Sequence, residues 1–139
     1  MTRLSSVAPV AIALVLLAAS TALVGCSSDD GCDLDDYTRD QGGFGLMDCG
    51  LAFDDTSAVD ACAVMALRQG GTFRALYETE DGGLEAIVHT SEGVYIQVRT
   101  PADGASLEQT PCEDGILIEE DGRSYVGCFE PGEAELVCE

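Results

Sequence analysis

The sequence predicts an α+β fold in which one helix packs on a twisted antiparallel sheet of about five to six strands, braced by disulfides. Three observations carry this prediction. Residues 57–69 have the apolar spacing of a helix, residues 73–99 alternate as strands do, and six cysteines remain after the one that ends an apolar leader. A chain of 139 residues allows one such domain rather than two.

The segment 57–69 is the clearest helix. Thr56 or Ser57 can cap its start, and the two glycines that follow it supply a stop. Asp60 and Arg68 lie away from the centre of its apolar side. That side carries Val59, Cys62, Ala63, Met65 and Ala66. We therefore expect this helix to cover the sheet, and we expect residues 32–55 to form a loop with at most one short strand.

From residue 72 onward the apolar period changes to two. The strands 73–78, 84–89 and 94–99 are separated by turn sequences of hairpin length, which predicts an antiparallel meander. Arg74 and Arg99 lie on these strands and can pair with neighbouring carboxylates.

Two further turns follow the meander. Asp121-Gly122 is a strong two-residue hairpin signal between strands 116–120 and 124–129. Pro131-Gly132 predicts a second hairpin, which returns the strand 134–138 beside its predecessor.

The cysteines predict three disulfides, because an even number in an exported chain is typical of a disulfide framework. None lies in a Cys-x-x-Cys pair and the chain has a single His, so zinc spacing is absent and no metal site is predicted. The six are Cys32, Cys49, Cys62, Cys112, Cys128 and Cys138.

Several pairings are open, and geometry favours one set. Cys49 and Cys62 flank the helix start. Counting outward from the Asp121-Gly122 turn sets Cys128 opposite Gly115, close to Cys112, whereas the last hairpin puts Cys138 and Cys128 on opposite faces. We expect the bridges Cys49–Cys62, Cys112–Cys128 and Cys32–Cys138, of which the last ties the domain ends together.

The N-terminus has the order of an export signal. Arg3 gives an early positive charge, and residues 4–24 carry no charge. An uncleaved membrane helix is the alternative, because about 20 apolar residues can span a bilayer. Leu23-Val24-Gly25-Cys26 resembles the lipobox of bacterial lipoproteins. This resemblance implies cleavage before Cys26 and attachment of diacylglycerol, with palmitate-type chains, to its sulfur.

The resemblance implies three parts: a signal peptide over 1–25, the lipidated Cys26 with a short tether over 26–31, and one domain over 32–139. The lipid bilayer is then a partner through the acylated cysteine. Ser27, rather than Asp, follows that cysteine, which favours an outer-membrane destination by the sorting rule of enteric bacteria. An inner membrane or the surface of a single-membrane cell is the alternative.

Charge and motifs exclude several classes of function. The 26 acidic and 6 basic residues, without a lysine, give a net charge of −20, which disfavours nucleic acid and repels anionic lipid surfaces. The lone His89 lacks an obvious nucleophile, and the aspartates between 29 and 40 do not match an EF-hand loop. No cofactor is predicted.

We therefore expect a membrane-anchored envelope lipoprotein that is not an enzyme and has a binding or structural role. Its partner is an unidentified protein or small ligand. The alternatives are a small envelope hydrolase or metal-dependent enzyme that uses His89, and an inhibitor-like protein that presents the loop 100–111.

Overall fold

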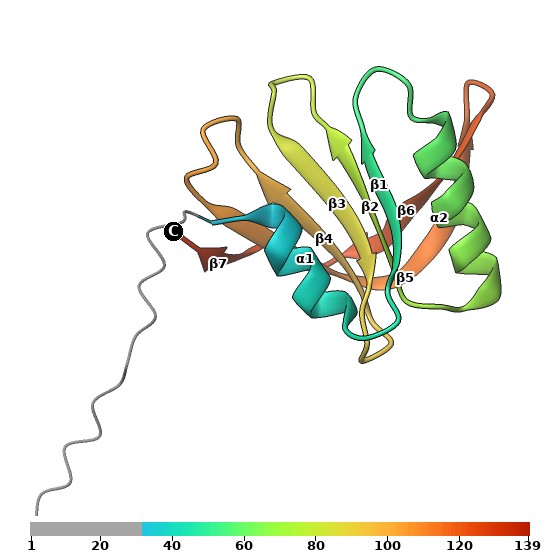
Figure 1. Cartoon of the computed structure of the whole chain (residues 1–139), viewed down its shortest axis with the longest axis horizontal. Coiled ribbons are helices and arrows are strands. Elements are labelled where there is room, and N and C mark those ends of the chain that lie inside the picture. Colours follow the sequence, from blue (N-terminus) through green and yellow to red (C-terminus); the bar gives the residue numbers. More distant parts are fainter. Residues whose placement is uncertain (1–31) are drawn as a thin grey trace, which may run out of the picture.

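The computed structural model describes residues 32–139, which form two helices and one strongly curved sheet (Figure 1). Cys26 and the segments predicted as signal peptide and tether lie outside the described residues. The elements in chain order are α1 Leu34–Gly42, β1 Met47–Ala52, α2 Ser57–Gln69, β2 Phe73–Glu78, β3 Leu84–His89, β4 Tyr95–Thr100, β5 Leu107–Glu120, β6 Arg123–Pro131 and β7 Glu135–Cys138.

The sheet runs in the order β1-β2-β3-β4-β5-β6, and β7 pairs with the outer side of β5. The predicted meander of β2, β3 and β4 is confirmed, with antiparallel pairing throughout. The pairing of β1 with β2 is parallel, which differs from the antiparallel sheet expected. A parallel neighbour needs a crossover, and α2 supplies it.

The two helices cover opposite faces of the central strands. Ala75 and Ile87 belong to the core under α2, whereas Leu76 and Val88, one residue further along each strand, belong to the core under α1. Alternate side chains of a strand point to opposite faces, so both faces of β2 and β3 are buried. Figure 1 shows α1 in front of the sheet, with β5 and β6 sweeping behind it toward α2.

The curvature of the sheet comes from β5, which is long enough to pair with different strands along its two halves. Its first part pairs with β4, and its second part pairs with β6 in a hairpin that reaches α2. Gly115 lies where the Tyr95 ring packs against the strand, and a side chain there would collide with that ring. The predicted hairpin is confirmed: Asp121 and Gly122 both have positive φ, 50° and 81°, as a type I′ turn requires.

Three disulfides join the pairs favoured from the sequence. Cys49–Cys62 fixes α2 to β1, Cys112–Cys128 joins β5 to β6, and Cys32–Cys138 closes the domain end to end. Each bridge thus links two segments that the chain brings together from different elements or ends.

Two of the predicted elements are wrong. Residues 34–42 form a helix and not a loop. The domain therefore has two helices instead of one, and they pack on a sheet of six to seven strands. The segment that follows does contain one strand, β1. The last strand pairs with β5 at Leu107–Cys138 and not with β6, because the chain crosses to the free edge of the first part of β5. This crossing is what brings Cys138 to Cys32.

Candidate functional site

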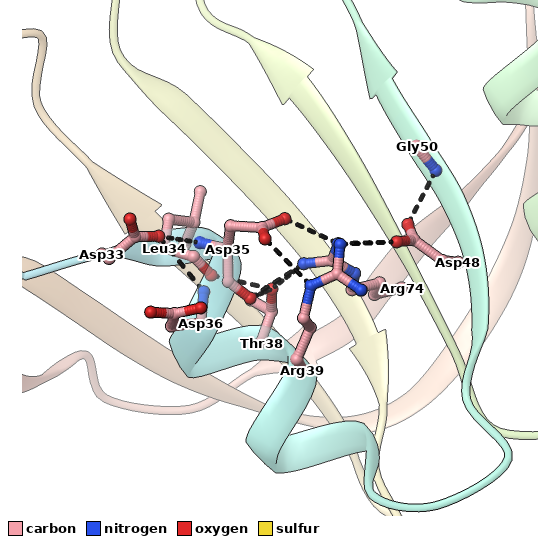
Figure 2. A network of polar contacts seen from close by, with 9 residues as sticks. All are labelled: Asp33, Leu34, Asp35, Asp36, Thr38, Arg39, Asp48, Gly50 and Arg74. Carbon is pink, nitrogen blue, oxygen red and sulfur yellow. Dashed lines mark hydrogen bonds and ion pairs between the residues drawn. The ribbon is translucent and has the colours of Figure 1, made fainter.

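A buried arginine lies at the centre of the largest polar network in the described chain. Arg74, the second residue of β2, is 2 % exposed and points toward α1 (Figure 2). Its Nη2 contacts Asp35 Oδ1 at 2.6 Å and Asp48 Oδ2 at 2.7 Å. A buried guanidinium needs such partners because an uncompensated charge in the core is strongly unfavourable.

Arg74 also fixes the backbone of α1. Its Nη1 donates to the carbonyl oxygen of Asp35 at 2.9 Å and to Thr38 Oγ1 at 3.0 Å. Thr38 is fully buried, and its hydroxyl donates in turn to the Leu34 carbonyl oxygen. The first turn of α1 is therefore attached to β2 through one side chain.

The sequence of α1 builds this turn locally. Asp33 is the N-cap, and its Oδ1 accepts hydrogen bonds from the backbone N–H groups of Asp35 and Asp36. Leu34 anchors the helix in the core under it. Capping and the apolar contacts of Leu34 and Tyr37 position the carboxylate of Asp35 over the sheet.

A second arginine completes the network from the solvent side. Arg39 Nε donates to Asp35 Oδ2 at 2.9 Å, and its Nη2 lies 3.1 Å from Asp48 Oδ2. We call Arg74, Arg39, Asp35 and Asp48 the Arg74 cluster. Two positive and two negative groups alternate in it, so its net charge is zero.

The cluster shifts the titration of its carboxylates. The hydrogen bond from Arg39 holds the pKa of Asp35 below its ordinary value, against the effect of burial, and Arg74 acts in the same direction. For Asp48, burial raises the pKa, but hydrogen bonds from Arg74 and the Gly50 N–H outweigh it and lower the pKa. Both carboxylates are ionised at neutral pH.

A hollow of about 580 Å³ opens beside the Arg74 cluster, on the face of the sheet that α1 covers only in part. Its size lies in the range of small-molecule sites. The charged side chains of the cluster form one wall. The rest is largely apolar and includes Leu34, Leu51, Leu76, Leu84 and the two glycines Gly50 and Gly104.

The hollow lies at the end of the domain where the chain enters. Cys32 lines it, and the Cys32–Cys138 disulfide brings the C-terminus to the same place (Figure 1). The site is thus built next to the segment that joins the domain to its N-terminal extension.

A second ionic contact attaches α2 to the β5–β6 hairpin. Asp60 is buried and accepts from Arg123 Nε at 2.6 Å, from Arg123 Nη2 at 2.9 Å, and from the hydroxyls of Thr56 and Tyr77. Burial raises the pKa of Asp60, but these hydrogen bonds outweigh it and lower the pKa. Burial raises the pKa of Tyr77, and the adjacent Asp60 adds to this. The oxygens of Asp60 are fully used, so this contact is structural.

The helical wheel misplaced two residues of α2. Asp60, expected away from the centre of the apolar side, is buried, and Met65, expected on that side, is exposed. The wheel assumes one flat covering surface, whereas α2 is enclosed between the sheet and the returning β6 strand.

His89 lies at the end of β3 on the face toward α2 and not on a solvent face. Its ring stacks on Tyr95 at 4.3 Å, and its Nδ1 is 2.7 Å from the Gly71 carbonyl oxygen, to which it donates. The His89 side chain does not line the hollow beside the Arg74 cluster. His89 therefore makes structural contacts with β4 and with Gly71, which follows α2.

The other features considered in the sequence are the distal cysteines, a metal site, the loop 100–111 and Cys26. The six distal cysteines are all in disulfides. Within residues 32–139 no three metal-ligating side chains converge. The loop expected over 100–111 is shorter in the structure, because β5 already begins at Leu107. Cys26 lies outside the described residues.

Sequence reasoning noted that Arg74 can pair with carboxylates but missed its burial and the role of Asp35. The partners lie 39 and 26 residues away in the chain, so no local pattern reports them. One signal of this burial was available in the sequence: Arg74 stands between Phe73 and Ala75 in a mainly apolar strand, and the chain has no lysine.

In residues 32–139 no helix is both long and apolar enough to cross a membrane. Comparison with protein-family models, with curated proteins and with solved structures finds no match to this chain.

Proposed function

We propose that this protein is a lipid-anchored binding protein of a bacterial cell envelope, held by an acylated Cys26 and without enzymatic activity. The lipobox Leu23-Val24-Gly25-Cys26 supports the anchor. The hollow beside the Arg74 cluster is the binding site, because it combines an apolar lining with a fixed polar wall. Ser27 favours an outer-membrane location by the sorting rule given above, with an inner membrane or the surface of a single-membrane cell as the alternative.

One observation carries the binding role. The hollow opens beside Cys32, six residues from the anchored cysteine, so the site sits at the tethered end of the domain. A ligand that approaches along the envelope surface meets this end first.

The enzyme and inhibitor alternatives have less support. The ring of His89 is held by Tyr95 and Gly71, and no hydroxyl or carboxylate lies in hydrogen-bond contact with it among the described residues. For an inhibitor, the exposed connection after β4 is reduced to about residues 101–106.

The anchor is tested by metabolic labelling with a fatty acid in a host that processes lipoproteins. The wild-type protein and the control variant Ser27→Ala should incorporate label, and Cys26→Ala should not, because only the cysteine sulfur can form the thioether. Label on the Cys26→Ala protein, or no label on the wild type, would contradict the anchor.

A further inference from the structure

The position of the hollow limits which ligands reach it first. Cys32 lies six residues after Cys26, and an extended chain over those six steps spans at most about 20 Å. Because Cys32 lines the hollow, the cavity stays within that distance of the anchored lipid. The proposed anchor therefore keeps the hollow near bilayer lipids.

The floor of the hollow fits a hydrocarbon chain. Leu34 and Leu76 are buried beneath it, Leu84 is half-buried, and Leu51 stands exposed on the β1 wall. Leu51 and Leu84 therefore supply most of the accessible apolar surface, and Leu34 and Leu76 close the floor beneath it. An acyl chain placed against them removes apolar surface from water on both sides.

The rim offers groups of both charges to a headgroup. Arg39 uses its Nε and one Nη toward the carboxylates of the Arg74 cluster, which leaves three of its five N–H groups without a partner in residues 32–139. Asp33 accepts only backbone N–H groups and forms no ion pair in the same region. The remaining arginine, Arg74, has both terminal nitrogens engaged.

We infer that the hollow binds a zwitterionic phospholipid from the bilayer that holds the anchor, which deepens the proposed binding function and rests on the anchoring at Cys26. One acyl chain lies along the leucine floor. The phosphate accepts from the free N–H groups of Arg39, and the ammonium group lies at Asp33. The net charge of −20 disfavours anionic lipids, which leaves zwitterionic headgroups as the fitting class.

The experiment uses the absence of tryptophan from the chain. Leu51→Trp puts a fluorophore on the wall of the hollow, and Leu117→Trp puts one on β5, outside the residues that line it. The two parent side chains are matched in exposure, at 38 % and 37 %. The full-length lipidated proteins are reconstituted in phosphatidylcholine–phosphatidylethanolamine vesicles with brominated acyl chains, which quench tryptophan on contact.

We expect strong quenching of the Leu51→Trp protein and little quenching of Leu117→Trp. Adding Arg39→Met should raise the fraction of brominated lipid needed for half-maximal quenching about tenfold, the effect of one lost charge-assisted hydrogen bond. Arg68→Met, which changes an exposed arginine at the end of α2, should leave quenching unchanged.

Three outcomes would overturn the inference. Equal quenching of both reporters would show that the domain lies in the bilayer or that no lipid enters the hollow. Quenching that persists unchanged with Arg39→Met would show a wall immersed in the membrane without headgroup binding. A wild-type protein that does not float with the vesicles would overturn the anchor itself, and flotation is measured first so that the two failures are distinguished.

Discussion

Replacing Arg74 with methionine tests whether one buried side chain holds α1 on the sheet. Methionine keeps most of the apolar stem and removes the guanidinium, together with two contacts to carboxylates and two to the backbone and hydroxyl of α1. The prediction concerns the free energy of unfolding.

The magnitude follows from what is left behind. Breaking a fully buried ion pair costs about 3–5 kcal/mol, because a charge remains in the core without a partner. Here the side chains of Asp35 and Asp48 are 49 % and 33 % exposed, so water and Arg39 can stabilise them once Arg74 is gone. The contacts share one group and do not add independently. We therefore expect a loss of about 2–3 kcal/mol.

The matched control is Arg99→Met, which removes another arginine from a strand of the same sheet. The Arg99 side chain is 58 % exposed and its only ionic contact in the described chain is to Glu85, at 3.8 Å. An exposed pair of this kind contributes less than about 1 kcal/mol. Any difference between the two variants therefore reports the burial of Arg74 and not the loss of a positive charge from an acidic protein.

Urea unfolding of the disulfide-intact proteins gives the two free energies, and hydrogen exchange locates the change. Amides of α1 should lose protection in Arg74→Met while those of α2 keep it. The reasoning is refuted if Arg74→Met and Arg99→Met have the same stability, or if protection falls equally in both helices.

Three further predictions follow from the contacts. Folding lowers the pKa values of Asp60 and of the carboxylates in the Arg74 cluster, so the stability they contribute is complete above the ordinary carboxyl pKa range and is lost as the pH falls through the lower folded pKa values. Unfolding midpoints measured from pH 7 to pH 2 should therefore decline only at the acidic end. An early decline near pH 6 would contradict this. Replacing both Cys49 and Cys62 with alanine should destabilise the domain by about 3 kcal/mol, as expected for a short closed loop, with the thermal midpoint as the measure and an unchanged midpoint as the contrary result. His89→Ala should lower that midpoint modestly through loss of the stacked ring and the bond to Gly71, and complementation by the variant should be retained; lost complementation with intact folding would favour the enzyme alternative.

The sequence shows the residues of the candidate site but not that they lie together. The carboxylates near residue 35, the strand arginine and the cysteine at residue 32 are all visible in the sequence. Their convergence depends on α1, whose nine residues include few apolar side chains and whose stability comes from the Asp33 cap, the Arg74 contacts and the nearby disulfide. A helix this short is marginal without such tertiary contacts.

The sequence by itself determined the local geometry of this protein. Period-two alternation placed β2, β3 and β4, the Asp121-Gly122 turn set the register of the β5–β6 hairpin, and glycines after residue 69 ended α2. These features depend on backbone conformations and on neighbours a few residues away, which a linear pattern records directly.

Only the tertiary structure decided which faces are buried and which edges meet. The alternation in β2 is compatible with one solvated face, yet both faces are covered, because α1 and α2 lie on opposite sides of the sheet. The last strand joined β5 because that edge was free and because Cys138 could then reach Cys32. Burial and edge pairing depend on contacts between residues far apart in the chain, so no local pattern fixes them, and the hollow beside the Arg74 cluster exists only through those contacts.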